Sequence, residues 1–277
     1  VLRANSNTFE SIGSNRIKFQ FYDLMKPVGQ LHQEILNDDL DILICPPSVL
    51  SYFVDIKSEL KVKRIISVAE VLEGVDRNKI ESHFGVTLHQ FYSSTEGEIA
   101  ATCEHGTLHL NEGIMVIQKE WLDEEKGWYH PIITDFRRKS QPIIRYRLND
   151  ILVASRENCP CGDAREVISS IMGRSDDVFH LPKHNGTIEL VVPDLIRRAI
   201  MQMSDEITDY IAIQKSPNHI ELQLKPDNLE DLLMTGFNNL WQSKNIQPPI
   251  IDIKPYTHLP SATKLRRIYR QFNSRKD

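Results

Sequence analysis

The sequence predicts an α/β fold with a parallel sheet, an antiparallel β subdomain and a small C-terminal α+β domain. Three observations predict it. Strand-type apolar runs alternate with helical segments up to about residue 105, the helical period disappears over about 106–172, and it returns near the C-terminus. We place the domain boundary near residue 175, with residues 1–175 in the large domain and residues 176–277 in the small one.

The parallel part is predicted from strands that alternate with helices. Proline is tolerated in the first turn of a helix, so Pro46-Pro47 marks a helix start, and Gly85 marks a helix end. The order strand–helix–strand–helix–strand predicts a parallel, doubly wound sheet with right-handed crossovers. The predicted segments are the strand Leu40–Cys45, the helix from Pro46, the strand 63–68, the helix 75–84 and the strand 86–92.

The antiparallel subdomain, at about 106–172, is predicted from short strand-like runs that turn residues separate. A barrel-like or meander arrangement packed beside the parallel sheet is expected from such spacing. The runs are Met115–Gln118, Pro131–Phe136, Pro142–Tyr146 and Ile151–Ala154.

The last hundred residues mix both periods, which predicts a small α+β domain. The expected strands are 177–181, 187–191, 208–214, 219–225 and 250–254, and the expected helices are 193–203 and 228–243.

Composition excludes several classes of protein. The 277 residues are 40% hydrophobic, enough for a core, and 33 Lys and Arg against 38 Asp and Glu give a net charge of −5. A mildly acidic chain lacks the basic footprint of a nucleic-acid binder, and no apolar run approaches the roughly 18 residues of a membrane span. Four cysteines do not make a disulfide framework, so we expect metal ligands or free thiols and a cytoplasmic protein that binds neither nucleic acid nor membrane.

The first residues suggest that the chain is a fragment. Residues 1–7, which begin with Val1 rather than Met, resemble the middle of a helix and its exit. We therefore expect an N-terminal part to be missing, and the alternative is simple removal of a methionine or a tag.

Two polar segments follow strands of the predicted parallel sheet. In such sheets ligands bind outside the carboxyl ends of the strands. Ser67-Val68-Ala69-Glu70 leaves the second strand, and residues 92–97, with the sequence Tyr-Ser-Ser-Thr-Glu-Gly, leave the third. Hydroxyls, a carboxylate and a glycine in one turn could hold a phosphate and its Mg²⁺, although spacing alone favours an ordinary capped turn.

The segment 141–150 predicts a second polar site. Alternation along a strand places Arg145 and Arg147 on one face, with Ile144 and Tyr146 opposite. Asp150 follows in the turn, where a carboxylate is suited to gripping two neighbouring hydroxyls, as on ribose. Without further context, a surface strand with a salt bridge explains the same pattern.

Four motifs in order resemble those of the acyl-adenylate-forming enzymes, most closely the phenylacetate–CoA ligase-like branch. Residues 92–96 resemble the Tyr-x-x-Thr-Glu motif, and residues 142–150 resemble the Tyr-Arg-Thr-Gly-Asp segment in its phenylacetate–CoA ligase form. Residues 173–177 resemble the Gly-Arg-x-Asp-Asp hinge, and residues 259–267 resemble the segment that carries the catalytic lysine. The resemblance covers the whole chain and implies that its parallel sheet is a portion of the large adenylate-forming domain.

The resemblance implies a two-step reaction. A carboxylic acid attacks the α-phosphate of ATP to give acyl-AMP and pyrophosphate, and a thiol, commonly coenzyme A, then takes the acyl group. The resemblance implies that Thr95 contacts the AMP phosphate, that Glu96 binds Mg²⁺ and that Lys264 contacts the α-phosphate and carboxylate oxygens. It implies that Asp150 binds the ribose hydroxyls, that Arg174 binds the ribose or phosphates and that Asp176 is the hinge. The acyl and adenine pockets would be lined by Ser67, Ala69 and Glu70, with Tyr92 near the adenine.

Departures from the family pattern leave two alternatives open. The Ser/Thr/Gly-rich phosphate loop is absent, Leu148-Asn149 replaces Thr-Gly, Thr263 replaces the glycine before the lysine, and residues 180–186 lack the usual glycine-bearing turn. An enzyme that hands its product to a carrier-protein thiol, or does not form a thioester, is one alternative. A non-catalytic binding or scaffold protein with this fold is the other.

The grouped cysteines predict a structural zinc site. Cys159 and Cys161 form a Cys-x-Cys knuckle, and Cys103 precedes His105 and His109 upstream. Three thiolates and one imidazole make a closed tetrahedral set, and the alternative is reduced thiols with surface histidines. By comparison with similar phenylacetate–CoA ligase relatives, His109 is the expected fourth ligand and His105 the second choice. Cys45 follows a strand and is expected in the core.

Overall fold

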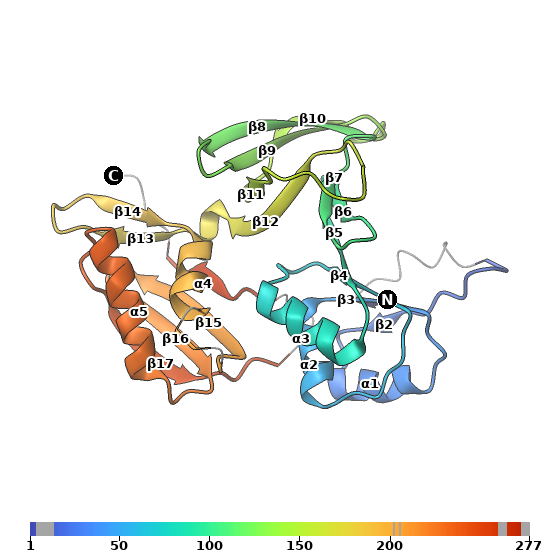
Figure 1. Ribbon diagram of the computed structural model, residues 1–277, viewed down its shortest axis with the longest axis horizontal. Coiled ribbons are helices and arrows are strands. Elements are labelled where there is room, and N and C mark those ends of the chain that lie inside the picture. Colours follow the sequence, from blue (N-terminus) through green and yellow to red (C-terminus); the bar gives the residue numbers. More distant parts are fainter. Residues whose placement is uncertain (4–13, 202, 205, 260–264, 273–277) are drawn as a thin grey trace. The chain divides into compact units, whose positions relative to one another are not determined.

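The computed structural model describes residues 1–3, 14–201, 203–204, 206–259 and 265–272 (Figure 1). The chain forms two compact units. Unit 1 comprises Val1–Leu148, Val153–Ser170 and Leu259–Leu265, and unit 2 comprises Asn149–Leu152, Ile171–His258 and Arg266–Asp277. The domain boundary near residue 175 stays a prediction.

The strands and helices up to residue 154 include those that the sequence predicts, in the predicted order, together with the helix α1 and several strands that were not predicted. They are β1 (Leu2–Arg3), β2 (Tyr22–Asp23), α1 (Val28–Leu36), β3 (Ile42–Cys45), α2 (Pro47–Asp55), β4 (Arg64–Val68), α3 (Gly74–Phe84), β5 (Leu88–Ser94), β6 (Gly97–Thr102), β7 (Leu108–Leu110), β8 (Met115–Asp123), β9 (Trp128–Asp135), β10 (Ile143–Arg147) and β11 (Asp150–Ala154).

The start of the chain differs from the expected helix exit. Leu2–Arg3 is the short strand β1, which pairs in parallel with β2. Leu2 is fully buried and joins the core of unit 1, so packing rather than helical propensity decides its conformation. Residues 4–7 of the expected segment lie outside the described residues.

The parallel core of unit 1 forms as predicted. β3, β4 and β5 pair in parallel, and their register places Leu43, Ile65 and Leu88 side by side, all fully buried. Apolar residues of α1, α2 and α3 join them in one hydrophobic core, and Figure 1 shows these helices together beside β3 and β4. The sheet is not doubly wound here, because the order β3-β4-β5 runs in one direction without a reversal.

The antiparallel strands extend the parallel sheet rather than packing beside it as expected. β6 pairs antiparallel with β5, and a single ten-stranded sheet runs in the order β10-β9-β11-β12-β7-β6-β5-β4-β3, with β8 paired to β9. β6, β7 and β12 were not foreseen, and they are the strands that join the two predicted regions. The β7–β12 pairing connects segments far apart in the sequence and positions the loop between β11 and β12.

The remaining elements confirm the predicted small α+β arrangement. They are β12 (Val167–Arg174), a 3₁₀ turn (Ser175–Asp177), β13 (Phe179–Pro182), β14 (Ile188–Val191), α4 (Pro193–Met201), β15 (Asp209–Ser216), β16 (His219–Lys225), α5 (Glu230–Ser243), β17 (Ile250–Pro255) and β18 (Ile268–Arg270).

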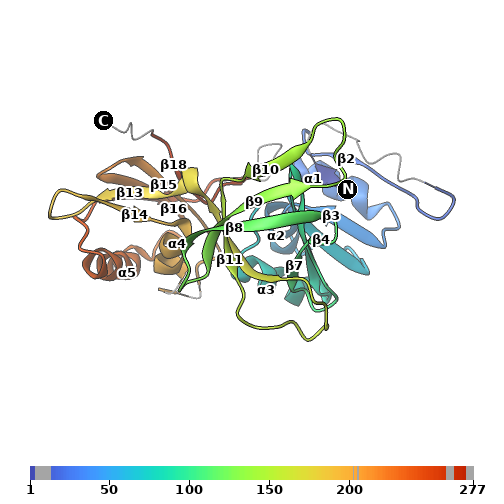
Figure 2. The same ribbon diagram turned by 90° about the horizontal axis from the view of Figure 1, so that it is seen from above.

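The core of unit 2 lies between a four-stranded sheet and two helices. The sheet order is β17-β16-β15-β18, and α4 and α5 lie together on one of its faces (Figure 2). Leu233, Phe237 and Trp241 recur every four residues on α5 and are all buried, which is the spacing of one helix face. β13 and β14 form a separate hairpin. Among the described helices, none is long and apolar enough to cross a membrane.

Candidate functional site

Three of the predicted site residues lie at the end of β4 and in the turn that follows it, and one of them, Ala69, has a strained backbone conformation. Ala69 has φ 73°, and the backbone N–H of Glu70 donates to the carbonyl of Val68 at 2.9 Å. This is a γ-turn with positive φ, which is rare for a residue other than glycine, and such strain gathers at functional sites. Ser67, just before it, is fully buried, and its hydroxyl has no hydrogen-bond partner among the described residues.

The carboxylate of Glu70 binds the first turn of α2. It accepts from the backbone N–H of Ser48 at 3.1 Å and from the Ser48 hydroxyl at 3.1 Å. The backbone N–H of Leu265 donates to the same carboxylate at 2.8 Å. Ser48 and Leu265 are partners that the sequence patterns did not reveal, and the assignment of Glu70 to the acyl and adenine pockets stays a prediction.

The turn between β5 and β6 presents Thr95 and Glu96. Thr95 is exposed and Glu96 half-buried, and the hydroxyl of Ser94 accepts from the Glu96 backbone N–H at 3.2 Å. The carbonyl of Thr95 accepts from the Arg138 guanidinium at 2.5 Å. Tyr92 is half-buried on β5, next to a bulge in the β5–β6 pairing. The turn therefore presents one hydroxyl and one carboxylate on a backbone that is tied down.

Asp135 supports this turn and was not foreseen. It is only 6% exposed, its carboxylate accepts from the Arg137 backbone N–H at 2.8 Å, and the Arg138 guanidinium lies 3.8 Å away. A Cβ at Gly97 would lie 3.5 Å from Asp135 and 3.1 Å from Met115, so glycine allows the turn to approach this buried carboxylate. An Asp at the end of an otherwise apolar strand was the available sequence signal.

Arg145 and Arg147 share a face, as alternation predicted. Arg145 donates to Gln118 at 2.9 Å and Arg147 to Glu120 at 2.5 Å, and these partners lie two residues apart on β8. Regular alternation is interrupted, because the β9–β10 register shifts between Ile143 and Tyr146 and Arg145 has φ 49°. The bulge leaves Ile144 70% exposed rather than opposite in a regular pleat.

The other predicted nucleotide residues belong to unit 2. Asp150 starts β11 and Arg174 ends β12, and Arg174 Nε lies 3.8 Å from Asp150 Oδ1. Asp176 follows in the 3₁₀ turn, where its carboxylate accepts from the Asn149 side-chain amide at 3.0 Å. Next to it, buried Asp177 accepts from the Arg266 guanidinium, and burial raises the pKa of the Asp177 carboxyl. Lys264 lies outside the described residues.

The predicted zinc ligands come together in unit 1. Cys103 starts the turn between β6 and β7, His109 lies on β7, and Cys159 and Cys161 lie in the loop between β11 and β12. Their four candidate ligand atoms all lie within 4.8 Å of one another. Cys103 Sγ is 3.6 Å from Cys159 Sγ, and Cys161 Sγ is 3.5 Å from His109 Nε2.

These two distances fit a tetrahedral metal. With Zn–S of about 2.3 Å and Zn–N of about 2.05 Å, tetrahedral angles give about 3.8 Å between two sulfurs and about 3.6 Å between sulfur and nitrogen. The observed 3.6 and 3.5 Å are close to both values. His105 is not part of this group, and its ring lies 3.7 Å from Glu104.

Neighbouring backbone and side chains orient the four groups for a metal. His109 Nδ1 lies 3.2 Å from the carbonyl of Arg165, which can only accept a hydrogen bond, so Nδ1 carries the proton. The lone pair of Nε2 is then available to bind a metal. The Asp163 backbone N–H donates to Cys161 Sγ at 3.5 Å. A hydrogen bond with the Thr107 side chain and one with the Cys161 backbone lower the pKa of the Cys159 thiol to about 6.

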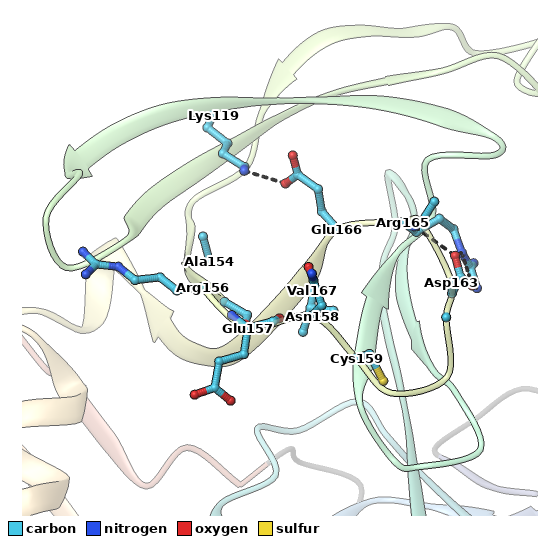
Figure 3. Close-up of a pocket in the computed structure, with 13 residues that line it drawn as sticks. Lys119, Ala154, Arg156, Glu157, Asn158, Cys159, Asp163, Arg165, Glu166 and Val167 are labelled. Atoms are coloured by element: carbon cyan, nitrogen blue, oxygen red, sulfur yellow. Dashed lines mark hydrogen bonds and ion pairs between the residues drawn. The ribbon is translucent and has the colours of Figure 1, made fainter.

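A polar hollow of about 530 Å³ lies beside this group (Figure 3). It is lined by Lys119 of β8 and by the loop between β11 and β12, including Cys159. Its cations already have partners, since Lys119 lies 2.5 Å from Glu166 and Arg165 lies 2.5 Å from Asp163. Hydrogen bonds from the side chain and backbone of Arg165 lower the pKa of the Asp163 carboxyl to about 2, so the carboxylate stays charged and is balanced by Arg165. With its charged groups paired in this way, the hollow favours no single ligand chemistry.

Solved structures share this fold. No family model and no curated protein matches the chain. The crystal structure of a 2-hydroxyisobutyryl-CoA ligase in complex with R3-HIB-AMP matches with a TM-score of 0.72 and 17% identity, covering 99% of this chain and 65% of that chain. The chain therefore has the fold of the matched part of that ligase.

Two further CoA ligases share the same fold. A benzoate CoA ligase from Burkholderia xenovorans has a TM-score of 0.58 and 14% identity, with 88% of this chain and 53% of that chain covered. An anthranilate CoA ligase in complex with anthranoyl-AMP has a TM-score of 0.55 and 12% identity, with 84% and 50% covered. The chain thus spans about half to two thirds of the length of these CoA ligases.

Proposed function

We propose that this chain is part of an ATP-dependent enzyme that activates a carboxylic acid, aryl or acyl, as acyl-AMP. The acid oxygen bonds to the α-phosphorus of ATP while the bond to pyrophosphate breaks. A thiolate of coenzyme A or of a carrier protein then bonds to the acyl carbon and AMP leaves. The motifs at 92–96 and 142–150 favour the phenylacetate–CoA ligase-like branch.

The observation that carries the proposal is the coincidence of motif and fold. The chain matches an acyl-AMP-bound ligase over 99% of its length. Within the described residues, the motif at 92–96 lies at the end of β5 and in the turn after it, the motif at 142–150 lies on β10 and at the start of β11, and the motif at 173–177 lies at the end of β12 and in the 3₁₀ turn. Thr95 and Glu96 occupy the β5–β6 turn, which the Arg138 contact holds in place. ATP and Mg²⁺ would supply the leaving group and its charge neutralisation.

The residues have distinct proposed roles in this chemistry. Thr95 binds the AMP phosphate and Glu96 ligates Mg²⁺, which prefers carboxylate and phosphate oxygens. Asp150 binds the ribose and Arg174 binds the ribose or phosphates. The 3.8 Å between Arg174 Nε and Asp150 Oδ1 is close enough for both side chains to contact the same ligand. Asp176 is the hinge, and Lys264 stabilises charge on the reacting oxygens, as a mobile ammonium can.

We also propose a structural zinc at Cys103, His109, Cys159 and Cys161. The fit of the two measured separations to tetrahedral geometry supports it. Because all four positions are protein ligands, such a site is closed and does not open a catalytic coordination position. It would tie the turn after β6 to the loop before β12.

The experiment that tests the function is ATP–pyrophosphate exchange by the full-length protein with a panel of aryl and medium-chain acids, with and without coenzyme A. Glu96→Gln and Lys264→Ala should each lower exchange by about a hundredfold or more. Glu98→Gln is the matched control, since Glu98 is exposed and lies two residues from Glu96 on β6. Unchanged exchange in Glu96→Gln would overturn the assigned roles, and no exchange with any acid would favour a non-catalytic protein with this fold.

A further inference from the structure

Glu70 connects the start of α2 to the residue that follows Lys264. Its Oε2 accepts from the Ser48 backbone N–H at 3.1 Å, and its Oε1 accepts from the Ser48 hydroxyl at 3.1 Å. Oε1 also accepts from the Leu265 backbone N–H at 2.8 Å. All three residues belong to unit 1, so these contacts lie within one compact body.

The start of α2 explains why a carboxylate is held there. Pro46 and Pro47 have no backbone N–H, so Ser48 supplies the first donor of the helix. The first N–H groups of a helix lack partners within it, and the helix dipole favours a negative charge at this end. Glu70 satisfies both requirements, and its carboxylate also accepts from the Leu265 backbone N–H.

The strained turn before Glu70 fixes its direction. Ala69 at φ 73° and the Glu70-to-Val68 hydrogen bond of 2.9 Å reverse the chain directly after β4. A residue with a side chain is strained at this positive φ, because its Cβ crowds the backbone where glycine has none. The strained residue, Ala69, directly precedes Glu70 and sets the direction of its side chain. Backbone strain at such a position is typical of a functional turn rather than of a simple connection.

We propose that Glu70 is the positioning residue for the lysine segment. By holding Leu265, it fixes the backbone immediately after Lys264 on the unit that carries Thr95 and Glu96. This inference rests on the proposed function, because it assigns Glu70 to the half-reaction that uses Lys264. Glu70 acts through Leu265 and does not touch the reacting atoms.

The two half-reactions should therefore depend on Glu70 differently. Formation of acyl-AMP uses Lys264, so loss of the Leu265 contact lowers it. Transfer of the acyl group from acyl-AMP to the thiol does not use Lys264 and should proceed almost unchanged. A merely structural role for Glu70 would lower both half-reactions together with thermal stability.

The test compares Glu70→Ala and Glu70→Gln in the full-length protein. In Glu70→Ala, hydrogen exchange of the Leu265 amide should quicken about tenfold or more, and pyrophosphate exchange should fall by a similar factor, as expected for a lost bond to a charged acceptor. Glu70→Gln keeps an oxygen acceptor and should show a smaller change in both. Glu59→Gln, an exposed glutamate of unit 1, is the matched control.

Each outcome decides the inference. Faster Leu265 exchange together with a selective loss of acyl-AMP formation supports it, with thioester formation from supplied acyl-AMP retained. Unchanged Leu265 exchange overturns the docking contact, whether or not the protein is active. Faster Leu265 exchange with undiminished pyrophosphate exchange overturns the positioning role and leaves the proposed function standing. A wild-type protein inactive with every acid overturns the proposed function and the catalytic role of Glu70 with it, whereas the hydrogen-exchange result still decides the contact.

Discussion

The side-chain amide of Asn149 donates a hydrogen bond of 3.0 Å to the carboxylate of Asp176. The carbonyl of Asn149 also accepts from the Ser175 backbone N–H at 2.8 Å and from the Ser175 hydroxyl at 3.0 Å. Asn149 stands where the family pattern has glycine, and glycine could make only the contacts of the carbonyl. The substitution thus adds a side-chain contact to the residue proposed as the hinge.

Replacing Asn149 by Ala should destabilise the chain slightly. The variant loses one exposed hydrogen bond, so the free energy of unfolding should fall by about 0.5–1.5 kcal/mol, near the lower end. Urea unfolding measures it. Asn228→Ala, at an exposed position of unit 2, should change stability less. Equal effects of the two substitutions would show that the amide contact contributes nothing.

Glycine at position 69 should stabilise the protein. Ala69→Gly removes the strain of φ 73° but makes the unfolded chain more flexible, so the net gain should be up to about 1 kcal/mol. Ala69→Val should destabilise, because a β-branched residue fits positive φ worse than alanine. Ala101→Gly in β6 is the control, and it should lower the free energy of unfolding by about 0.5–1 kcal/mol. If Ala69→Gly lowered the free energy of unfolding as much as Ala101→Gly does, the backbone at Ala69 would not be strained.

His32 should make stability fall in mild acid. It is buried on α1 with Nε2 2.8 Å from the Ser58 hydroxyl, and burial lowers the pKa of its imidazole. The unfolded chain, with a histidine pKa near 6.5, therefore binds more protons than the folded one, and unfolding becomes easier as pH falls through about 6.5 toward the lower folded value.

The measurement is the free energy of unfolding between pH 8 and pH 5. His32→Gln keeps a hydrogen-bonding side chain but cannot titrate, so the decline with falling pH should be shallower. His184→Gln, at an exposed site, should leave the slope of the wild type. Burial also lowers the pKa of His89, His180 and His258, so part of the slope should persist in the variant. An unchanged slope in His32→Gln would contradict the assignment.

Purified protein should contain about one equivalent of zinc. Cys159→Ser should lower the metal content and the midpoint of thermal unfolding, and a chelator should lower the midpoint of the wild type but not of this variant. Cys45→Ala is the control, because Cys45 is fully buried on β3 and its burial raises the pKa of the thiol. Protein purified under reducing conditions without any bound metal would contradict the site.

Local patterns predicted the elements well and the sheet less well. Proline marked the start of α2 and glycine the end of α3, and the predicted helix 228–243 agrees closely with α5. β7 has only three residues, and β12 pairs with it across a long stretch of sequence. The hydrophobic periodicity of a short segment carries no information about pairing with a distant strand. The sequence therefore predicts a parallel sheet and a separate antiparallel subdomain where the structure has one continuous sheet.

For the candidate site too, the sequence predicted the residues that come together but not the contacts that orient them. The four zinc ligands were chosen from residue types and resemblance, and the structure brings all four together. The contacts that orient them could not be foreseen, because the Arg165 carbonyl and the Asp163 N–H are backbone groups present in every sequence. The same holds for Glu70, whose partners are a helix start and the backbone of Leu265.

The β7–β12 pairing has a consequence for the order of folding. β3, β4, β5 and β6 each pair with the strand that comes next along the chain, so this part of the sheet can assemble while synthesis continues. Cys103 and Cys159, in contrast, are 56 residues apart, and β12 begins only after the second of them. Closing that loop is a non-local step of the kind that slows folding. A ribosome-bound chain that ends before residue 159 holds His109 and Cys103 without Cys159 and Cys161, so the proposed zinc site can be completed only late in synthesis.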